Sequence, residues 1–167
     1  MKLNAIIAAA ALTLSTAVHA APTYQGAVNF VDPEFGLFSK GGLTGPFDLY
    51  WDFVLAGGPW SATSSVTSRV NGTKDVDFSS VFLTDGVTTQ NFIQSGFDPA
   101  EAWQLAPVTL LDNVVYEIHA IGSATGGAAF AGEVQLTAAV PEPSSVALVL
   151  IGLGAIGLAT RRRSKIA

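Results

Sequence analysis

A strict alternation of apolar and polar residues over residues 47–55 most constrains what this chain can fold into. Five apolar side chains fall on one face of an extended segment: Phe47, Leu49, Trp51, Phe53 and Leu55. The opposite face carries Asp48, Tyr50 and Asp52. A period of two residues is typical of a β-strand with one buried face. Residues 130–138 repeat the pattern, so at least two such strands are expected.

Glycine-rich turns divide the surrounding sequence into further strand candidates. These candidates cover residues 24–31, 62–70, 75–83, 88–93 and 114–121, and the last of them suits a central strand because it is apolar on both faces except for Glu117 and His119. Turn signals occur at residues 40–42, 56–59, 70–73, 84–86 and 126–127. Asn71-Gly72 and Asp85-Gly86 are the strongest hairpin signals, and Asn71-Gly72 favours a type I′ turn. Between residues 21 and 140 the only helix-like stretch is a possible turn at residues 98–103.

Seven or eight short strands joined by such turns predict an all-β fold. We expect an antiparallel β-sandwich or jelly roll over residues 21–139. The chain contains no cysteine, so disulfides and thiolate metal sites are excluded. A domain of about 120 residues can still bury enough apolar surface to fold without them.

The N-terminus has the three parts of a secretory signal peptide. Lys2 is followed by an apolar run over residues 5–14, and Val18-His19-Ala20 places small residues at the −3 and −1 positions. We therefore predict a signal peptide over residues 1–20, cleaved by signal peptidase between Ala20 and Ala21. A buried N-terminal helix is the alternative.

The C-terminus also has three parts. Pro141-Glu142-Pro143 is followed by an apolar run over residues 144–160 and by the basic cluster Arg161, Arg162 and Arg163, with Lys165 behind it. A helix of 17 residues would be about 25 Å long, slightly less than a bilayer core of about 30 Å. We expect a single transmembrane helix whose basic end stays cytoplasmic. A core helix is one alternative, and a linker that merely anchors the domain is another.

This order of parts over residues 140–167 resembles the PEP-CTERM sorting signal. The resemblance implies export in a Gram-negative bacterium that makes extracellular polysaccharide. It also implies a transient inner-membrane intermediate, recognition by an exosortase and removal of the tail near Pro141, Glu142 and Pro143. The segments 45–55 and 121–132 further resemble a group of PEP-CTERM proteins named for a Phe-x-Asp-x-Phe motif. In this chain the aspartate after Phe47 stands one place early, at Asp48.

Charge narrows the range of partners. Residues 21–139 contain three basic and twelve acidic side chains, a net charge of −9 against −5 for the whole chain. Such a surface repels anionic membranes and nucleic acid, so no nucleic-acid partner is expected. The acidic side chains are expected mainly to form a solvated surface.

No set of residues predicts catalysis, a metal centre or a cofactor. Asp75 and Asp77 would lie about 6.6 Å apart on one side of a strand, within the range of glycosidase carboxylate pairs, but a solvated strand face is the simpler reading. Asp48 and Asp52 could join a calcium shell, although no calcium-loop motif is present. One mature histidine, His119, cannot make a zinc centre, and a core or cross-strand role is expected for it.

Two features suggest contact with sugars. Trp60 and Trp103 lie near predicted turns and could expose a stacking surface, whereas Trp51 belongs to the inward face. The Ser/Thr-rich residues 61–68 could carry O-linked sugars, with a polar strand face as the favoured alternative.

The sequence therefore predicts a non-enzymatic protein of the cell surface or extracellular matrix, linked to exopolysaccharide and biofilm. The alternatives are a lectin-like carbohydrate-binding module and a glycoside hydrolase acting on exopolysaccharide.

Overall fold

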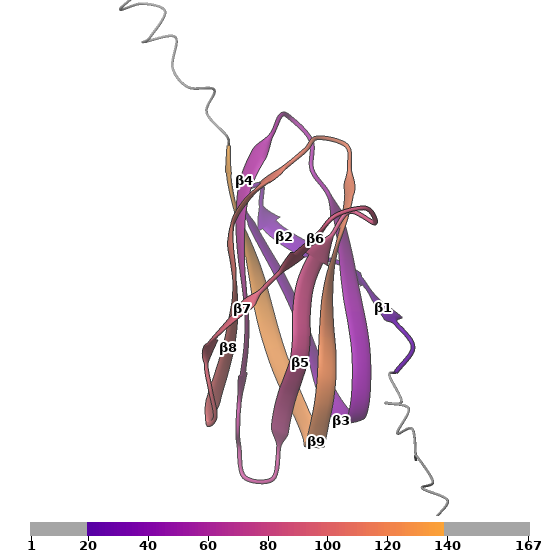
Figure 1. Cartoon of the computed structure of the whole chain (residues 1–167), viewed down its shortest axis with the longest axis vertical. Coiled ribbons are helices and arrows are strands. Elements are labelled where there is room, and N and C mark those ends of the chain that lie inside the picture. The colour runs from indigo at the N-terminus through magenta and orange to yellow at the C-terminus, as the bar shows by residue number, and fades with distance from the viewer. Residues whose placement is uncertain (1–19, 139–167) are drawn as a thin grey trace, which may run out of the picture.

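A computed structural model describes residues 20–138, and these fold entirely from β-strands (Figure 1). In chain order the strands are β1 (Thr23–Ala27), β2 (Asn29–Asp32), β3 (Phe35–Val54), β4 (Trp60–Arg69), β5 (Asp75–Thr84), β6 (Thr89–Asn91), β7 (Ile93–Gly96), β8 (Ala100–Leu110) and β9 (Val115–Ala138). The all-β prediction is confirmed. The predicted signal peptide and the helix over residues 144–160 lie outside the described residues, except for Ala20. Residues 20–138 contain no helical segment that could serve as a membrane span.

Two long strands, β3 and β9, organise the domain by running through two layers. The first part of β3 pairs with the last part of β9, and β4, β8 and β7 extend that layer while β2 flanks it. The last part of β3 pairs with the first part of β9, and β1, β5 and β6 complete the other layer. In Figure 1 both strands reach the lower end of the molecule and turn there. The two layers therefore share one continuous pair of strands.

The turn in β3 is proved by contacts between its own halves. Phe38 and Trp51 are 13 residues apart, which is roughly 43 Å along a straight strand. Their ring centroids are only 5.1 Å apart, so the strand folds back over itself. Register shifts at residues 40–45 and positive φ angles at Gly42 and Gly126 mark the bend in the two strands. Glycine adopts these angles without the steric cost that other residues have.

This bend corrects the prediction of short separate strands. The glycines at 40–42 and 126–127 were expected to end strands, but they bend β3 and β9 and do not interrupt them. A β-bulge with glycine at positive φ re-aims a strand without ending its pairing. The predicted turn at residues 56–59 and the hairpin at 84–86 are confirmed, since β5 and β6 pair on either side of Asp85.

Three other local predictions were wrong. The segment 24–31 divides into β1 and β2, and β1 pairs with β3 in parallel, so the domain is not wholly antiparallel. The turn after Asn71 has a positive φ only at Gly72, which excludes type I′ and its two positive φ angles. This turn carries the chain from β4 in one layer to β5 in the other. Residues 100–110 form strand β8, where only a helical turn at 98–103 was expected.

The core lies between the layers and is rich in aromatic rings. The five inward residues predicted from residues 47–55 are all buried, as expected. Phe130 lies at the centre, with ring centroids 5.0 Å from Phe78, 6.0 Å from Phe47 and 5.8 Å from Trp51. Burial of these rings from both layers stabilises the sandwich arrangement without disulfides.

Candidate functional site

A ladder of rings crosses the outer face of the layer that contains β1. Phe82, His119, Tyr50 and Tyr24 occupy directly paired positions on the neighbouring strands β5, β9, β3 and β1. The imidazole lies almost parallel to the rings of Phe82 and Tyr50, with centroids 4.7 Å and 5.1 Å away. Stacked rings cover one another's faces. The inner rings of the ladder, His119 and Tyr50, therefore present only their edges to solvent.

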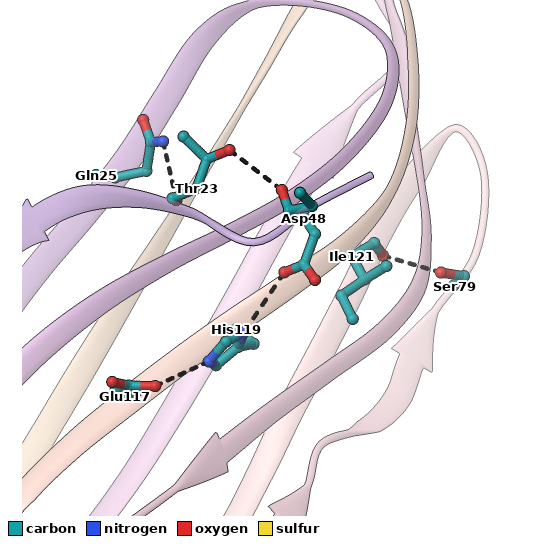
Figure 2. A network of polar contacts seen from close by, with 8 residues as sticks. Thr23, Gln25, Asp48, Ser79, Glu117, His119 and Ile121 are labelled. Carbon is teal, nitrogen blue, oxygen red and sulfur yellow. Dashed lines mark hydrogen bonds and ion pairs between the residues drawn. The ribbon is translucent and has the colours of Figure 1, made fainter. Parts of the chain in front are cut away.

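Carboxylates flank the histidine of this ladder on both sides. Figure 2 shows the imidazole between Asp48 and Glu117, with Nδ1 3.4 Å from the Asp48 carboxylate and Nε2 3.1 Å from Glu117. The cross-strand role predicted for His119 is thus confirmed. Both ring nitrogens face carboxylates, so neither faces a hydroxyl that it could activate as a nucleophile. Asp48 is itself buried, although the sequence pattern placed it on a solvated face.

The N-terminal edge of the ladder is fixed by Tyr24. Its hydroxyl donates a hydrogen bond of 2.8 Å to Asp52, and this bond raises the pKa of the Tyr24 hydroxyl above its ordinary value. Ala21, on the mature side of the predicted cleavage point, is exposed, and only Pro22 separates it from β1. Cleavage between Ala20 and Ala21 would therefore leave β1 complete.

Three carboxylates gather at the end of the molecule where β3 and β9 bend. Ligand oxygens of Asp75, Asp77 and Asp98 lie within 4.8 Å of one another. Desolvation, followed by the charges of Asp75 and Asp98, raises the pKa of Asp77. Carboxylate oxygens suit Ca²⁺, but Ca²⁺ takes six to eight oxygen ligands, so these three carboxylates alone do not define a calcium site. The sequence suggested the proximity of Asp75 and Asp77, whereas Asp98 joins them only through the fold.

A buried carboxylate, Glu101, links strands from both layers. It accepts hydrogen bonds from the Phe78 backbone N–H of β5 at 3.2 Å, from the Trp103 indole at 2.9 Å and from the Gln94 amide at 3.1 Å. Burial raises the pKa of Glu101, and the bonds from Trp103 and Phe78 oppose that shift. Sequence reasoning missed this role, although Glu101, Trp103 and Leu105 are spaced two residues apart and so share one face of β8.

The two tryptophans proposed as a sugar-stacking surface lie apart. Trp60 and Trp103 are both half-buried against the core, and their indole N–H groups donate to the Ala56 carbonyl and to Glu101. Trp103 pairs with Val66 of β4, six residues from Trp60, which is roughly 20 Å along the strand. The fold does not bring the two rings into one surface.

The Ser/Thr-rich segment forms β4 and divides its hydroxyls between two faces. Ser64 and Ser68 are buried and donate to the carbonyls of Glu133 and Val76. Thr63, Ser65 and Thr67 lie on the outer face. The polar strand face expected for these residues is therefore present on one side of β4 only.

Comparison with known proteins identifies the segment that follows the domain. A model of the PEP-CTERM protein-sorting motif matches residues 139–163, which lie outside the described residues. The sorting-signal prediction for Pro141, Glu142, Pro143 and the basic cluster Arg161–Arg163 rests on this same segment. No curated protein matches the sequence.

Two solved structures show a distant similarity of shape. One is PliG from Aeromonas hydrophila, a periplasmic inhibitor of g-type lysozyme, with 13% identity and a TM-score of 0.39, covering 70% of this chain and 100% of that chain. The other is the pre-peptidase C-terminal domain of a collagenase from Bacillus anthracis, with 8% identity and a TM-score of 0.37, covering 70% and 95%. These scores carry no functional argument. The matched motif does indicate function, because it shows that the chain carries a C-terminal signal for exosortase-type sorting of an exported protein to the surface.

Proposed function

We propose that this protein is a non-enzymatic component of the cell surface or extracellular matrix, with a role linked to exopolysaccharide and biofilm. In this proposal signal peptidase cleaves between Ala20 and Ala21, and residues 144–160 hold an inner-membrane intermediate. An exosortase then removes the tail near Pro141–Pro143. As part of the same proposal, the chain is a member of the Phe-x-Asp-x-Phe group of PEP-CTERM proteins.

The position of the sorting motif relative to the domain carries the proposal. β9 ends at Ala138, and the matched motif begins at residue 139. The last ladder pair of β9 joins Ala138 to Trp60 of β4. Cleavage near Pro141 would consequently remove no residue of a described strand. The domain would keep its full pairing after release.

The domain's charges and polar contacts support a surface role without catalysis. A net charge of −9 over residues 21–139 keeps the domain soluble and repels an anionic membrane surface. The buried Glu101 is occupied by three donors, and His119 by two carboxylates. Structural hydrogen bonding accounts for both groups, so neither calls for a catalytic role.

Intact-mass measurement with cell fractionation tests the sorting proposal. In a host that carries an exosortase, the mature protein should begin at Ala21 and end near Pro141, and it should be recovered outside the inner membrane. The same chain in a host without exosortase should keep its tail and remain membrane-bound. A variant with Pro141, Glu142 and Pro143 replaced by alanine should behave like the chain in that second host. Recovery of the uncleaved tail in the exosortase host would overturn the proposal.

A further inference from the structure

A trough lined by both polar and apolar side chains runs along the outer face of β4 in the layer that contains β7 and β8. It has a volume of about 540 Å³ and is open to solvent. Its floor is formed by the short side chains of Thr63 and Ser65, while longer side chains of β9 and β8 rise on either side. The contrast between short central and long flanking side chains creates the concave shape.

The strand register fixes the walls of the trough. Ser65 pairs with Glu133 of β9 on one side and with Gln104 of β8 on the other, and Gln104 pairs in turn with Ile93 of β7. Because β8 and β9 flank β4, the walls stand about 10 Å apart, two strand spacings. One extended polymer chain can lie between them. Gln135 donates to the Glu133 carboxylate at 3.2 Å and so holds one wall in position.

The chemistry of the lining favours hydroxyl groups as partners. Thr63, Ser65 and the amides of Gln104 and Gln135 can each donate and accept hydrogen bonds, as a sugar hydroxyl can. Ile93, which is 69% exposed, adds an apolar surface that suits the C–H face of a sugar ring.

Two other classes of polymer fit the trough poorly. Backbone N–H and C=O groups on a sheet face are already paired within the ladders, so an extended peptide would find few backbone partners there. The lining residues include Glu133 but no lysine or arginine, which disfavours polyanions such as nucleic acids and acidic polysaccharides.

We propose that this trough binds one extended chain of a neutral polysaccharide. The proposal deepens the surface role proposed above and rests on it for biological meaning, but the binding itself does not depend on tail removal. It assigns the sugar contact to β4, β7, β8 and β9, away from the half-buried Trp60 and Trp103.

Affinity electrophoresis of the full-length chain in mild detergent tests this proposal. Gels would contain dextran, laminarin or galactomannan as neutral probes, and alginate as the acidic probe. At least one neutral probe should retard the protein, and alginate should not. Ser65→Phe fills the centre of the trough, and Gln104→Ala removes one wall, so each should weaken the retarding interaction at least about tenfold, as expected when well-packed contacts are lost.

Thr67→Phe is the matched control, because Thr67 lies on the same face of the same strand but outside the trough. It should bind like the unmodified chain, and unchanged thermal unfolding of all three variants would show that they are folded. The proposal is overturned if no neutral probe retards the protein, if alginate does so instead, or if Ser65→Phe and Gln104→Ala bind normally. The sorting proposal is tested independently, because only an uncleaved tail in the mass measurement would refute it.

Discussion

Replacement of Phe130 by alanine should cost the domain a large part of its stability. Phe130 is only 4% exposed and contacts aromatic rings from three other positions, Phe47, Trp51 and Phe78. Removing a buried phenylalanine costs about 3–5 kcal/mol when the cavity cannot collapse. The three neighbouring rings all belong to the layer opposite Phe130, so closing the cavity would require the two layers to move toward each other. We expect a loss of about 4 kcal/mol, rising toward about 5 kcal/mol if the neighbouring rings do not shift.

Urea unfolding followed by tryptophan fluorescence measures this loss, and the buried Trp51 beside Phe130 reports directly on the core. In thermal unfolding, 4 kcal/mol should lower the melting temperature by about 15 °C for a domain of this size. Phe97→Ala is the matched control, because Phe97 is 71% exposed and its removal should change stability by less than about 0.5 kcal/mol. A loss below about 1.5 kcal/mol for Phe130→Ala, or an equal loss for both variants, would refute the packing argument.

Three further predictions concern the backbone, an acid-sensitive turn and the ring ladder. Gly122→Ala should prevent stable folding, since a Cβ there would lie 2.2 Å from the Asp77 carbonyl oxygen, and circular dichroism would show the loss of sheet. Asp85→Ala should destabilise the protein near neutral pH but much less well below pH 3.8, as measured by urea unfolding across pH. Hydrogen bonds from Thr88 and Val87 lower the pKa of Asp85 in the folded state, so its contribution is fully present above the unfolded-state pKa of 3.8 and is lost as pH falls through the lower folded-state pKa. His119→Ala should cost about 1–2 kcal/mol in the same assay, because two stacked pairs are lost.

Each of these predictions has its own control. Gly41→Ala should fold normally, since the nearest atom to its new Cβ would be 3.7 Å away, and misfolding of both glycine variants would point to a general intolerance of side chains in the bent strands. If Asp85→Ala lowers the free energy of unfolding equally at every pH, the ionised carboxylate of Asp85 is not the source of the stabilisation. His119→Phe keeps a ring in the ladder and should recover part of the loss; if it is no better than alanine, the carboxylate contacts matter more than stacking.

The sequence predicted those features that depend on local pattern or linear order. Alternation over residues 47–55 identified both the strand and its buried face, and the sorting signal was visible because its parts follow one another along the chain. The bend in β3 was missed, since a glycine that ends a strand and a glycine at positive φ within one look the same in sequence. Strand β8 was missed because a register shift opposite residues 62–64 disrupts its alternation.

The candidate sites could be predicted only in part, because they depend on pairing between distant strands. Asp48 and His119 are 71 residues apart in sequence, and their contact requires the register of β3 against β9. The trough likewise requires β4 to lie between β8 and β9. The local sequence pattern indicated the hydroxyl groups of β4. It could not indicate that side chains of β8 and β9 flank them and make the surface concave.

The central place of β9 also bears on how the domain would carry a mechanical load. The described chain ends on β9, and its last residues are paired to β4, with β3 on the other side over residues 130–135. A pull applied at Ala138 along the strand would load two ladders in shear, so many hydrogen bonds would have to fail together. An edge strand pulled sideways would instead open one bond at a time. A domain held at a surface through this end would therefore resist tension at its point of attachment.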